Sequence, residues 1–176
     1  MGTTFFISRA EAEKLAVSMF PGHPLYGKAV LVSCSTPTPN EDDLKLLEKV
    51  MSREEQLALC KPANVDSPGW LELVRLEFND VDPTNTSEGW LTGNNYIAFG
   101  DEHADKVIEL IERHKDSGIT FVCHCDAGIS RSAAISKFIA RQINAYFPES
   151  YSIYNKHVFS TLSRRLWTKQ GNGWYK

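Results

Sequence analysis

The stretch that decides the fold runs from Ile119 to Ser132 and reads ITFVCHCDAGISRS. Its opening residues, 119–124, form a short apolar run that is typical of a strand buried on both faces. From Ser132 onward apolar residues recur at helical spacing, at Ile135, Phe138, Ile139 and Ile143. The segment is therefore predicted to be a strand, a loop and a helix, with Cys125 directly after the strand.

Strands and helices are predicted to alternate along the rest of the chain. Short apolar or alternating runs indicate strands over 4–7, 28–33 and 70–78, and the charged alternation of the last one suits a strand nearer the sheet edge. Helices are expected over 8–19, 104–117 and 155–167, the first of them opened by a Ser8–Glu11 capping box. This order predicts an α/β fold with three layers, a mainly parallel central sheet flanked by helices, in a single domain spanning 1–176.

Two segments are less regular. Asn40 is expected to cap a helix that carries Leu44, Leu47 and Val50, and the charged stretch that follows, up to Lys61, has no clear assignment. Residues 79–95 are rich in Asp, Asn, Thr, Gly and Pro, which predicts a long loop. Long loops in compact domains are commonly functional, so we interpret this one as a lid.

Composition excludes several classes of protein. A net charge of −3 and a pI near 6.0 provide no overall field for a polyanion, so no nucleic-acid partner is expected. No apolar run approaches the roughly 18 residues that a membrane helix needs, and the first residues lack the pattern of a secretory signal. The four cysteines are too scattered for a disulfide scaffold. We therefore expect a cytoplasmic monomer with reduced thiols and no membrane association.

The loop after the central strand places a thiol, five intervening residues and an arginine in sequence, Cys125 to Arg131. Folded as a tight arc, such residues turn successive backbone N–H groups inward, and the positive end of the next helix adds to this nest for an anion. Gly128 allows the backbone to turn, and Arg131 can hold two phosphate oxygens in a bidentate fork. The expected phosphate-binding residues are Asp126, Ala127, Gly128, Ile129, Ser130 and Arg131.

The same N–H dipoles and guanidinium favour the thiolate form of Cys125. A thiolate directly beneath a phosphorus atom is placed for in-line attack, which forms a phosphocysteine intermediate. The anion site takes the place of a metal, and no cofactor is expected. Cys123, His124 and Cys125 could be taken for metal ligands, but they lack the C-x2-C spacing and a second pair, so we predict no metal site. Cys123 is expected in the core.

The motif HCDAGISRS, residues 124–132, resembles the HCxxGxxR[ST] signature of the cysteine-dependent protein tyrosine phosphatase superfamily, nearest its small dual-specificity-like members. The segment NDVDP, residues 79–83, is similar to the loop that carries the general acid in small bacterial and viral relatives, and YNKHVF, residues 154–159, is also similar to those relatives. The resemblance is clearest from Trp70 to about Trp167 and implies a three-layer phosphatase fold.

The resemblance implies a role for each matching residue. Cys125 becomes the nucleophile, Arg131 the phosphate clamp, and Ser132 the hydroxyl donor that helps the thiolate leave. His124 orients the loop rather than reacting. Asp80 matches the general acid, which protonates the departing oxygen and then activates the water that hydrolyses phosphocysteine.

Other assignments in the long loop stay open. Asp82 is the alternative general acid, but it precedes Pro83 and is held in an extended conformation, which suits shaping the loop better than swinging inward. Trp90 and Tyr96 either line the lid over an aryl substrate or simply pack against the body of the protein.

The sequence as a whole predicts a phosphatase that acts on phosphotyrosine in proteins or peptides, with phosphoserine and phosphothreonine as further substrates. One alternative is a phosphatase of phosphoinositides or RNA 5′ phosphates. Such substrates call for extra basic residues in the loop, where this chain has Asp126 and Ile129, and Asp126 would repel further phosphates. The other alternative is a module that binds phosphorylated partners without turnover.

Overall fold

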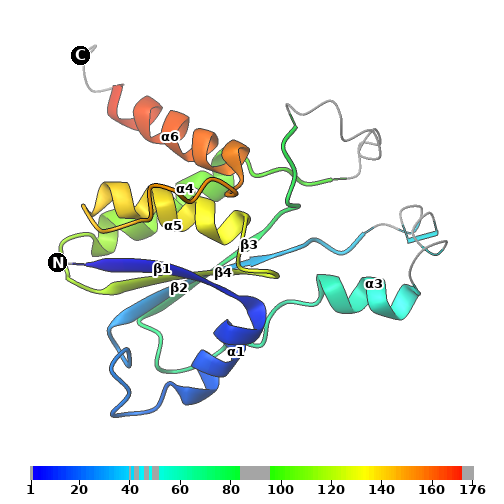
Figure 1. The fold of residues 1–176 in the computed structure, drawn as a ribbon, viewed down its shortest axis with the longest axis horizontal. Helices are drawn as coiled ribbons and strands as arrows, with labels where there is room; N and C mark the ends of the chain where they lie inside the picture. Colours follow the sequence, from blue (N-terminus) through cyan, green and yellow to red (C-terminus); the bar gives the residue numbers. More distant parts are fainter. Residues whose placement is uncertain are drawn as a thin grey trace.

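The computed structural model describes residues 2–39, 41, 44–45, 48, 52–83 and 96–171. A single four-stranded sheet lies at its centre (Figure 1), built from β1 (Thr3–Ser8), β2 (Ala29–Ser35), β3 (Glu72–Glu77) and β4 (Thr120–Cys125). The strand order is β1-β4-β2-β3, and every neighbouring pair is parallel. The predicted parallel α/β sheet is confirmed, and β3 lies at an edge as its charged alternation indicated.

Helices cover both faces of the sheet and form the outer layers. Helix α1 (Arg9–Ser18) lies on one side, and α4 (Asp101–His114), α5 (Arg131–Gln142) and α6 (Lys156–Gly171) lie on the other (Figure 1). Helix α3 (Arg53–Cys60) lies to the right of the sheet in the same view. Among the described residues no helix is long and apolar enough to cross a membrane.

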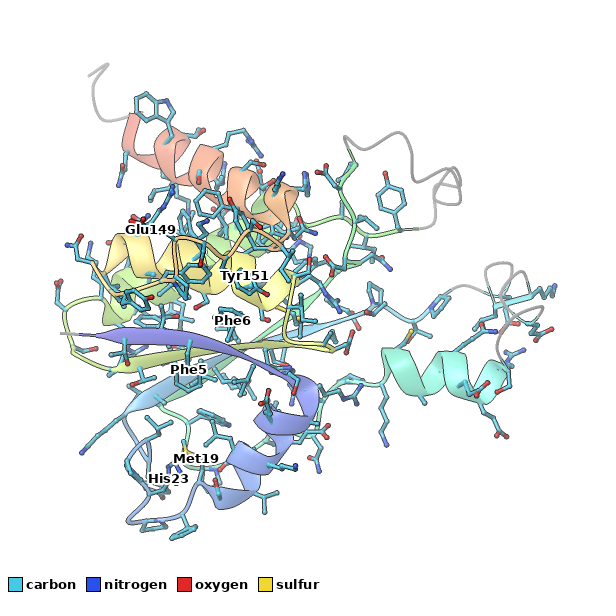
Figure 2. The ribbon with its side chains drawn as sticks, viewed as in Figure 1. Phe5, Phe6, Met19, His23, Glu149 and Tyr151 are labelled. Carbon is cyan, nitrogen blue, oxygen red and sulfur yellow. The ribbon has the colours of Figure 1, made fainter. Side chains whose placement is uncertain are left out.

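Each face of the sheet has its own hydrophobic core, because successive side chains along a strand point to opposite faces. Phe121 and Cys123 of β4 pack with α4, α5 and α6, whereas Val122 packs with α1 and Trp70. Strand β1 follows the same rule. Figure 2 shows Phe6 on the side of Tyr151, with its ring 5.0 Å from the tyrosine ring, and Phe5 on the side of Met19.

Capping residues explain where two helices begin. Ser8 and Glu11 form the predicted box at the start of α1, in which the Ser8 backbone N–H donates to Glu11 Oε2 at 2.8 Å. Ser52 and Glu55 form a second box at the start of α3, with the corresponding distance 2.9 Å. Helix α3 was not predicted, because charged residues hide its helical period, although the Ser-x-x-Glu signal is present in the sequence. The helix expected after Asn40 lies largely outside the described residues.

The other predicted elements are present with shifted ends. Helix α4 ends at His114, earlier than predicted, and the chain then turns to Gly118, whose φ of +69° is left-handed as expected. The last helix starts at Lys156, with Asn155 just before it, and continues to Gly171. Strand β4 and helix α5 flank a tight loop, so the strand–loop–helix unit predicted from the sequence is confirmed.

Candidate active site

The loop that joins β4 to α5, residues 125–132, is called the catalytic loop below. Cys125 is the last residue of β4 and Arg131 the first of α5, and their exposed fractions are 2% and 3%. Both chemically important side chains are therefore buried at the carboxyl edge of the sheet, where open α/β folds bind their ligands.

Ser132 lies beside the thiol. Its Oγ is 3.2 Å from Cys125 Sγ, and the whole Ser132 residue is buried. A hydroxyl has one proton to donate, and a thiolate can only accept, so a charged Cys125 receives this proton in a hydrogen bond. Ser132 is therefore in hydrogen-bonding contact with the thiol, and its role in helping the thiolate leave stays a prediction.

Gly128 sets the path of the loop. Its φ is +68°, and a Cβ atom there would lie 2.7 Å from Ile7 O and nearer still to Ser8 N, both in the backbone of the last residues of β1. Backbone cannot move aside as a flexible side chain can. The catalytic loop therefore packs directly against the end of β1, and only glycine fits at this position.

The catalytic loop contains backbone N–H groups that form no backbone hydrogen bond to other described residues. Within the described part of the chain, the backbone N–H groups of Gly128, Ile129 and Ser130 donate to no backbone carbonyl. Ser130 occupies the N-cap position of α5 but forms no capping bond with its side chain. The first N–H groups of α5 consequently keep their capacity to bind an anion.

The Arg131 guanidinium is fixed from several directions. Nη1 donates to Phe78 O at 2.9 Å and to Thr36 Oγ1 at 3.2 Å, and Nη2 donates to Asp126 Oδ2. Its Nε is buried and has no protein partner among the described residues. A buried N–H group without an acceptor is costly, by about 1–3 kcal/mol, unless a ligand oxygen accepts from it.

Asp126 forms contacts in the loop that were not predicted from the sequence. Its Oδ2 accepts from both Arg131 and Thr36, the latter at 3.1 Å. The carboxylate thus holds the guanidinium in place and puts a negative charge beside the phosphate nest. Thr36 was not a candidate in the sequence because it follows β2, far from the catalytic loop along the chain.

His124 lies beneath the loop and is 1% exposed. Its Nε2 is 2.8 Å from Ser33 Oγ on the neighbouring strand β2. Burial lowers the pKa of His124 to about 4, so the ring is neutral at physiological pH. A neutral imidazole hydrogen-bonded within the sheet can orient the loop. Burial also raises the pKa of Cys34 and of Cys123, so both remain thiols.

Asp80 reaches the catalytic loop from the segment after β3. Its Oδ1 accepts from Ser130 Oγ at 2.8 Å and from Asn155 Nδ2 at 2.8 Å. Asp82 lies further along the same segment and is half-buried. Asp80 is thus held beside the catalytic loop, and its role as the acid stays a prediction. Trp90 and most of the predicted lid lie outside the described residues.

Two further residues hold the catalytic loop through contacts that were not predicted from the sequence. Tyr151 donates its hydroxyl to Ile129 O at 2.6 Å, and the Asn155 backbone N–H donates to Ser130 O at 3.2 Å. Asn155 was recognisable as the start of the last helix, but no local signal indicates which loop a cap residue will contact. Such contacts depend on how α6 packs.

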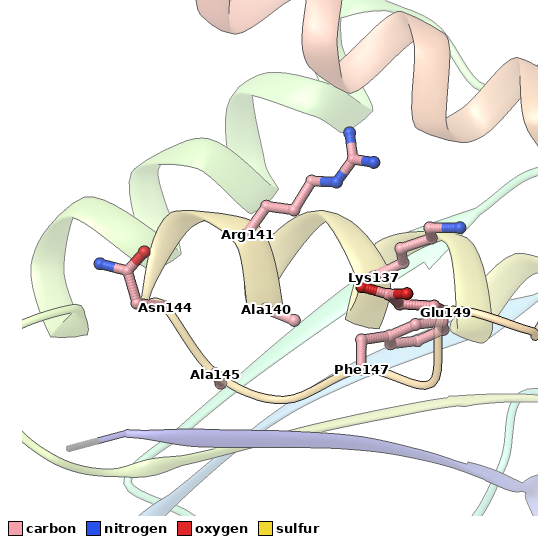
Figure 3. A pocket seen from close by; sticks show the side chains of 7 residues that line it. All are labelled: Lys137, Ala140, Arg141, Asn144, Ala145, Phe147 and Glu149. Carbon is pink, nitrogen blue, oxygen red and sulfur yellow. The ribbon is translucent and has the colours of Figure 1, made fainter.

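A cavity of about 610 Å³ lies along α5 and the segment after it (Figure 3). Its walls contain no residue of the catalytic loop; they are Lys137, Ala140, Arg141, Asn144, Ala145, Phe147 and Glu149.

Among the described residues no group of three or more His, Cys, Asp or Glu side chains is arranged to hold a metal ion.

Comparison with known proteins finds similarity at the level of structure. Neither a family model nor a curated protein matches the chain. A solved structure described as the crystal structure of PTPMT1 is similar, with a TM-score of 0.43 and 13% sequence identity, over 99% of this chain and 96% of that chain.

Proposed function

We propose that the protein is a phosphatase of the cysteine-dependent protein tyrosine phosphatase superfamily, which hydrolyses phosphomonoesters through a phosphocysteine at Cys125. The observation that carries the proposal is the catalytic loop at the start of α5. It combines a buried thiol, a buried arginine and backbone N–H groups that donate to no backbone carbonyl of the described residues. Such an arrangement suits a tetrahedral dianion.

The first step transfers the phosphoryl group to sulfur. The Cys125 thiolate attacks phosphorus, the bond from phosphorus to the ester oxygen breaks, and Asp80 gives its proton to that oxygen. Arg131 and the loop N–H groups stabilise the charge on the three non-bridging oxygens. Protonation matters because a tyrosine leaving group has a pKa of about 10 and leaves slowly as an anion at neutral pH.

The second step releases phosphate. Water attacks phosphorus, the Asp80 carboxylate accepts a proton from it, and the bond between phosphorus and sulfur breaks. The Ser132 hydroxyl, 3.2 Å from Sγ, donates to the departing thiolate. Inorganic phosphate then leaves, and both Cys125 and Asp80 are returned to their starting protonation states.

We propose phosphotyrosine in proteins or peptides as the substrate, with phosphoserine and phosphothreonine as further substrates. The Asp126 carboxylate beside Arg131 supports a substrate with one phosphate, because it repels additional phosphates. Exposed apolar side chains near the loop support an aryl ester as the substrate. Ile129 of the loop is 45% exposed, and Ile97 is 49% exposed. Ile97 lies near Asp80 because its backbone is hydrogen-bonded to Asn79, the residue before Asp80.

A substrate panel tests the proposal. Purified protein is given a phosphotyrosine peptide, a phosphoserine peptide, a phosphoinositide in vesicles and an RNA with a 5′ phosphate, and released phosphate is measured. We expect the tyrosine peptide to have the highest kcat/KM, and Cys125→Ser to release none. Preference for the phosphoinositide or the RNA would move the substrate to the alternative class. Tight binding of the peptide without turnover would make the protein a binding module.

A further inference from the structure

We infer that Asn155, the cap of α6, is a positioning residue that holds the Asp80 side chain over the catalytic loop. The inference rests on the proposed function, in which Asp80 is the general acid. It comes from a juxtaposition of three elements at Asn155, the residue before the N-terminal end of α6. The Asn155 side chain donates to Asp80 in the segment after β3, and its backbone N–H donates to Ser130 O in the catalytic loop.

The orientation of the Asn155 amide is set by its surroundings. The side chain is buried, since only 8% of the residue is exposed. Its Oδ1 accepts from the Val158 backbone N–H at 2.9 Å, which caps α6, so Nδ2 must point the other way. Nδ2 then donates to Asp80 Oδ1 at 2.8 Å and to Val81 O at 3.2 Å. Both of its protons are used on the segment that carries the acid.

This contact determines which oxygen of Asp80 can carry the transferable proton. Oδ1 already accepts from Ser130 Oγ and from Asn155 Nδ2, each at 2.8 Å. An oxygen with two donors directed at it is a poor site for a further proton, so the protonated acid carries its proton on Oδ2. Asn155 thereby fixes both the position of the carboxyl group and the oxygen from which it donates.

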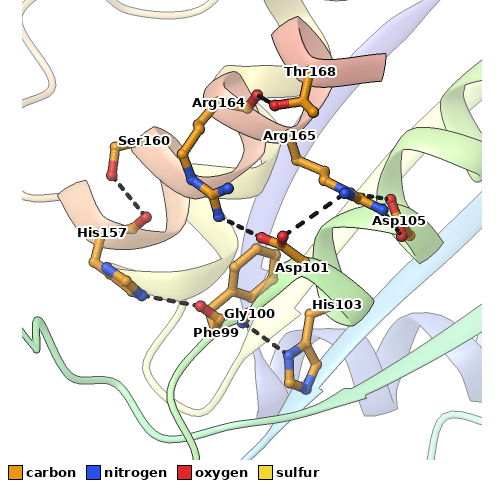
Figure 4. Close-up of polar contacts among 10 residues, drawn as sticks. All are labelled: Phe99, Gly100, Asp101, His103, Asp105, His157, Ser160, Arg164, Arg165 and Thr168. Carbon is orange, nitrogen blue, oxygen red and sulfur yellow. Dashed lines mark hydrogen bonds and ion pairs between the residues drawn. The ribbon is translucent and has the colours of Figure 1, made fainter. Parts of the chain in front are cut away.

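The N-terminal end of α6 can hold Asp80 in place because ion pairs join α6 to α4 (Figure 4). Arg165 donates to Asp105 through Nε and Nη2, at 2.8 and 2.7 Å, and Arg164 pairs with Asp101. Nε2 of His157, the second residue of α6, is 2.9 Å from Phe99 O. Side chains on rigid, packed elements hold a reacting group more closely than side chains on loops do.

The simpler reading is that Asn155 only caps α6. The two roles use different atoms of the same amide: Oδ1 for the cap and Nδ2 for Asp80. Asp and Ser are also good cap residues, so Asn155→Asp and Asn155→Ser keep an acceptor for Val158. Neither one keeps an amide donor directed at Asp80. Ser160→Ala is the matched control, because Ser160 lies on α6 and donates only to His157 O in the described structure.

The experiment measures kcat for a phosphotyrosine peptide and for a nitrophenyl phosphate, together with urea unfolding. We expect both Asn155 variants to lose roughly 10- to 100-fold in kcat on the peptide and less than about threefold on the activated ester, since a misplaced acid matters most for a poor leaving group. The urea midpoint of Asn155→Ser should stay close to that of the wild-type protein. Asn155→Asp should lower the midpoint, because it places a second carboxylate beside Asp80 and Val81 O. Ser160→Ala should change neither rate.

An equal loss on both substrates, or no loss, would show that Asn155 is a cap alone. The double variant Asn155→Ser with Asp80→Asn adds a second check, because removal of the acid should leave nothing for Asn155 to position. A further large loss in the double variant would therefore also overturn the inference. If Asp80→Asn alone retains normal kinetics on both substrates, the fault lies instead in the proposed function, which assigned the acid to Asp80.

Discussion

Substitution of Gly128 by alanine is the change whose effect follows most directly from the structure. Two penalties are expected. A left-handed φ, +68° here, disfavours alanine by on the order of 1–2 kcal/mol. The added Cβ would also overlap the backbone of Ile7 and Ser8, and overpacking of this kind typically destabilises by about 1–3 kcal/mol. Gly128→Ala should therefore lower the free energy of unfolding by roughly 2–5 kcal/mol.

Gly27 provides the matched control. Its φ is +65°, but a Cβ atom at this position meets nothing within 4 Å, so Gly27→Ala carries the first penalty without the second. Urea unfolding of both variants gives the two free energies. Because a shift of the loop by about 1 Å can reduce a rate on the order of 100-fold, Gly128→Ala should also lose most of its turnover while Gly27→Ala retains it. Equal destabilisation in the two variants would refute the claim that the loop packs against β1.

The remaining predictions concern single side chains. Arg131→Lys should lower kcat/KM by about 100-fold or more, because a point charge cannot reproduce the fork, and it should weaken inhibition by vanadate in parallel. Asp80→Asn should reduce kcat on the order of 10²- to 10⁴-fold for phosphotyrosine but far less for a nitrophenyl ester, and it should flatten the fall in rate at high pH. Asp82→Asn should leave both the leaving-group dependence and the fall in rate at high pH unchanged. If Asp82→Asn shows these effects and Asp80→Asn does not, Asp82 is the general acid instead. For His124, the folded-state pKa of about 4 lies below the usual 6.5, so the unfolded chain binds more protons between these values. Stability should consequently fall by roughly 2 kcal/mol from pH 7 to pH 5. In urea unfolding, the free energy of unfolding of His124→Gln should fall less between pH 7 and pH 5 than that of the wild-type protein. An equal fall in both proteins would contradict the assignment of this pH dependence to His124.

Much of the fold could be predicted from local patterns in the sequence. Apolar runs marked β2 and β4, helical spacing marked α4, α5 and α6, and the Ser8–Glu11 box marked the start of α1. These signals suffice because each depends on residues close together in the chain. Helix α3 was missed for the opposite reason: its charged sequence lacks an apolar stripe, and its capping box was the only local signal.

The contacts that complete the site could not be predicted in this way. Thr36 reaches Arg131 from the end of β2, and Asn155 reaches Asp80 from the start of α6. Each pair is distant in sequence, and the contact exists only because strands and helices pack in a particular order. Asp126 was expected to repel additional phosphates, but its hydrogen bond to the Arg131 guanidinium is visible only in the folded loop.

Trapping of the intermediate tests the central claim most directly. Protein mixed with a radiolabelled phosphotyrosine peptide is quenched in acid within a single turnover, digested and analysed by mass spectrometry. The account predicts one phosphoryl group on the peptide that contains Cys125, bound to sulfur, and none in Cys125→Ser. Turnover that persists in Cys125→Ser, or a phosphoryl group found on another residue, would contradict it.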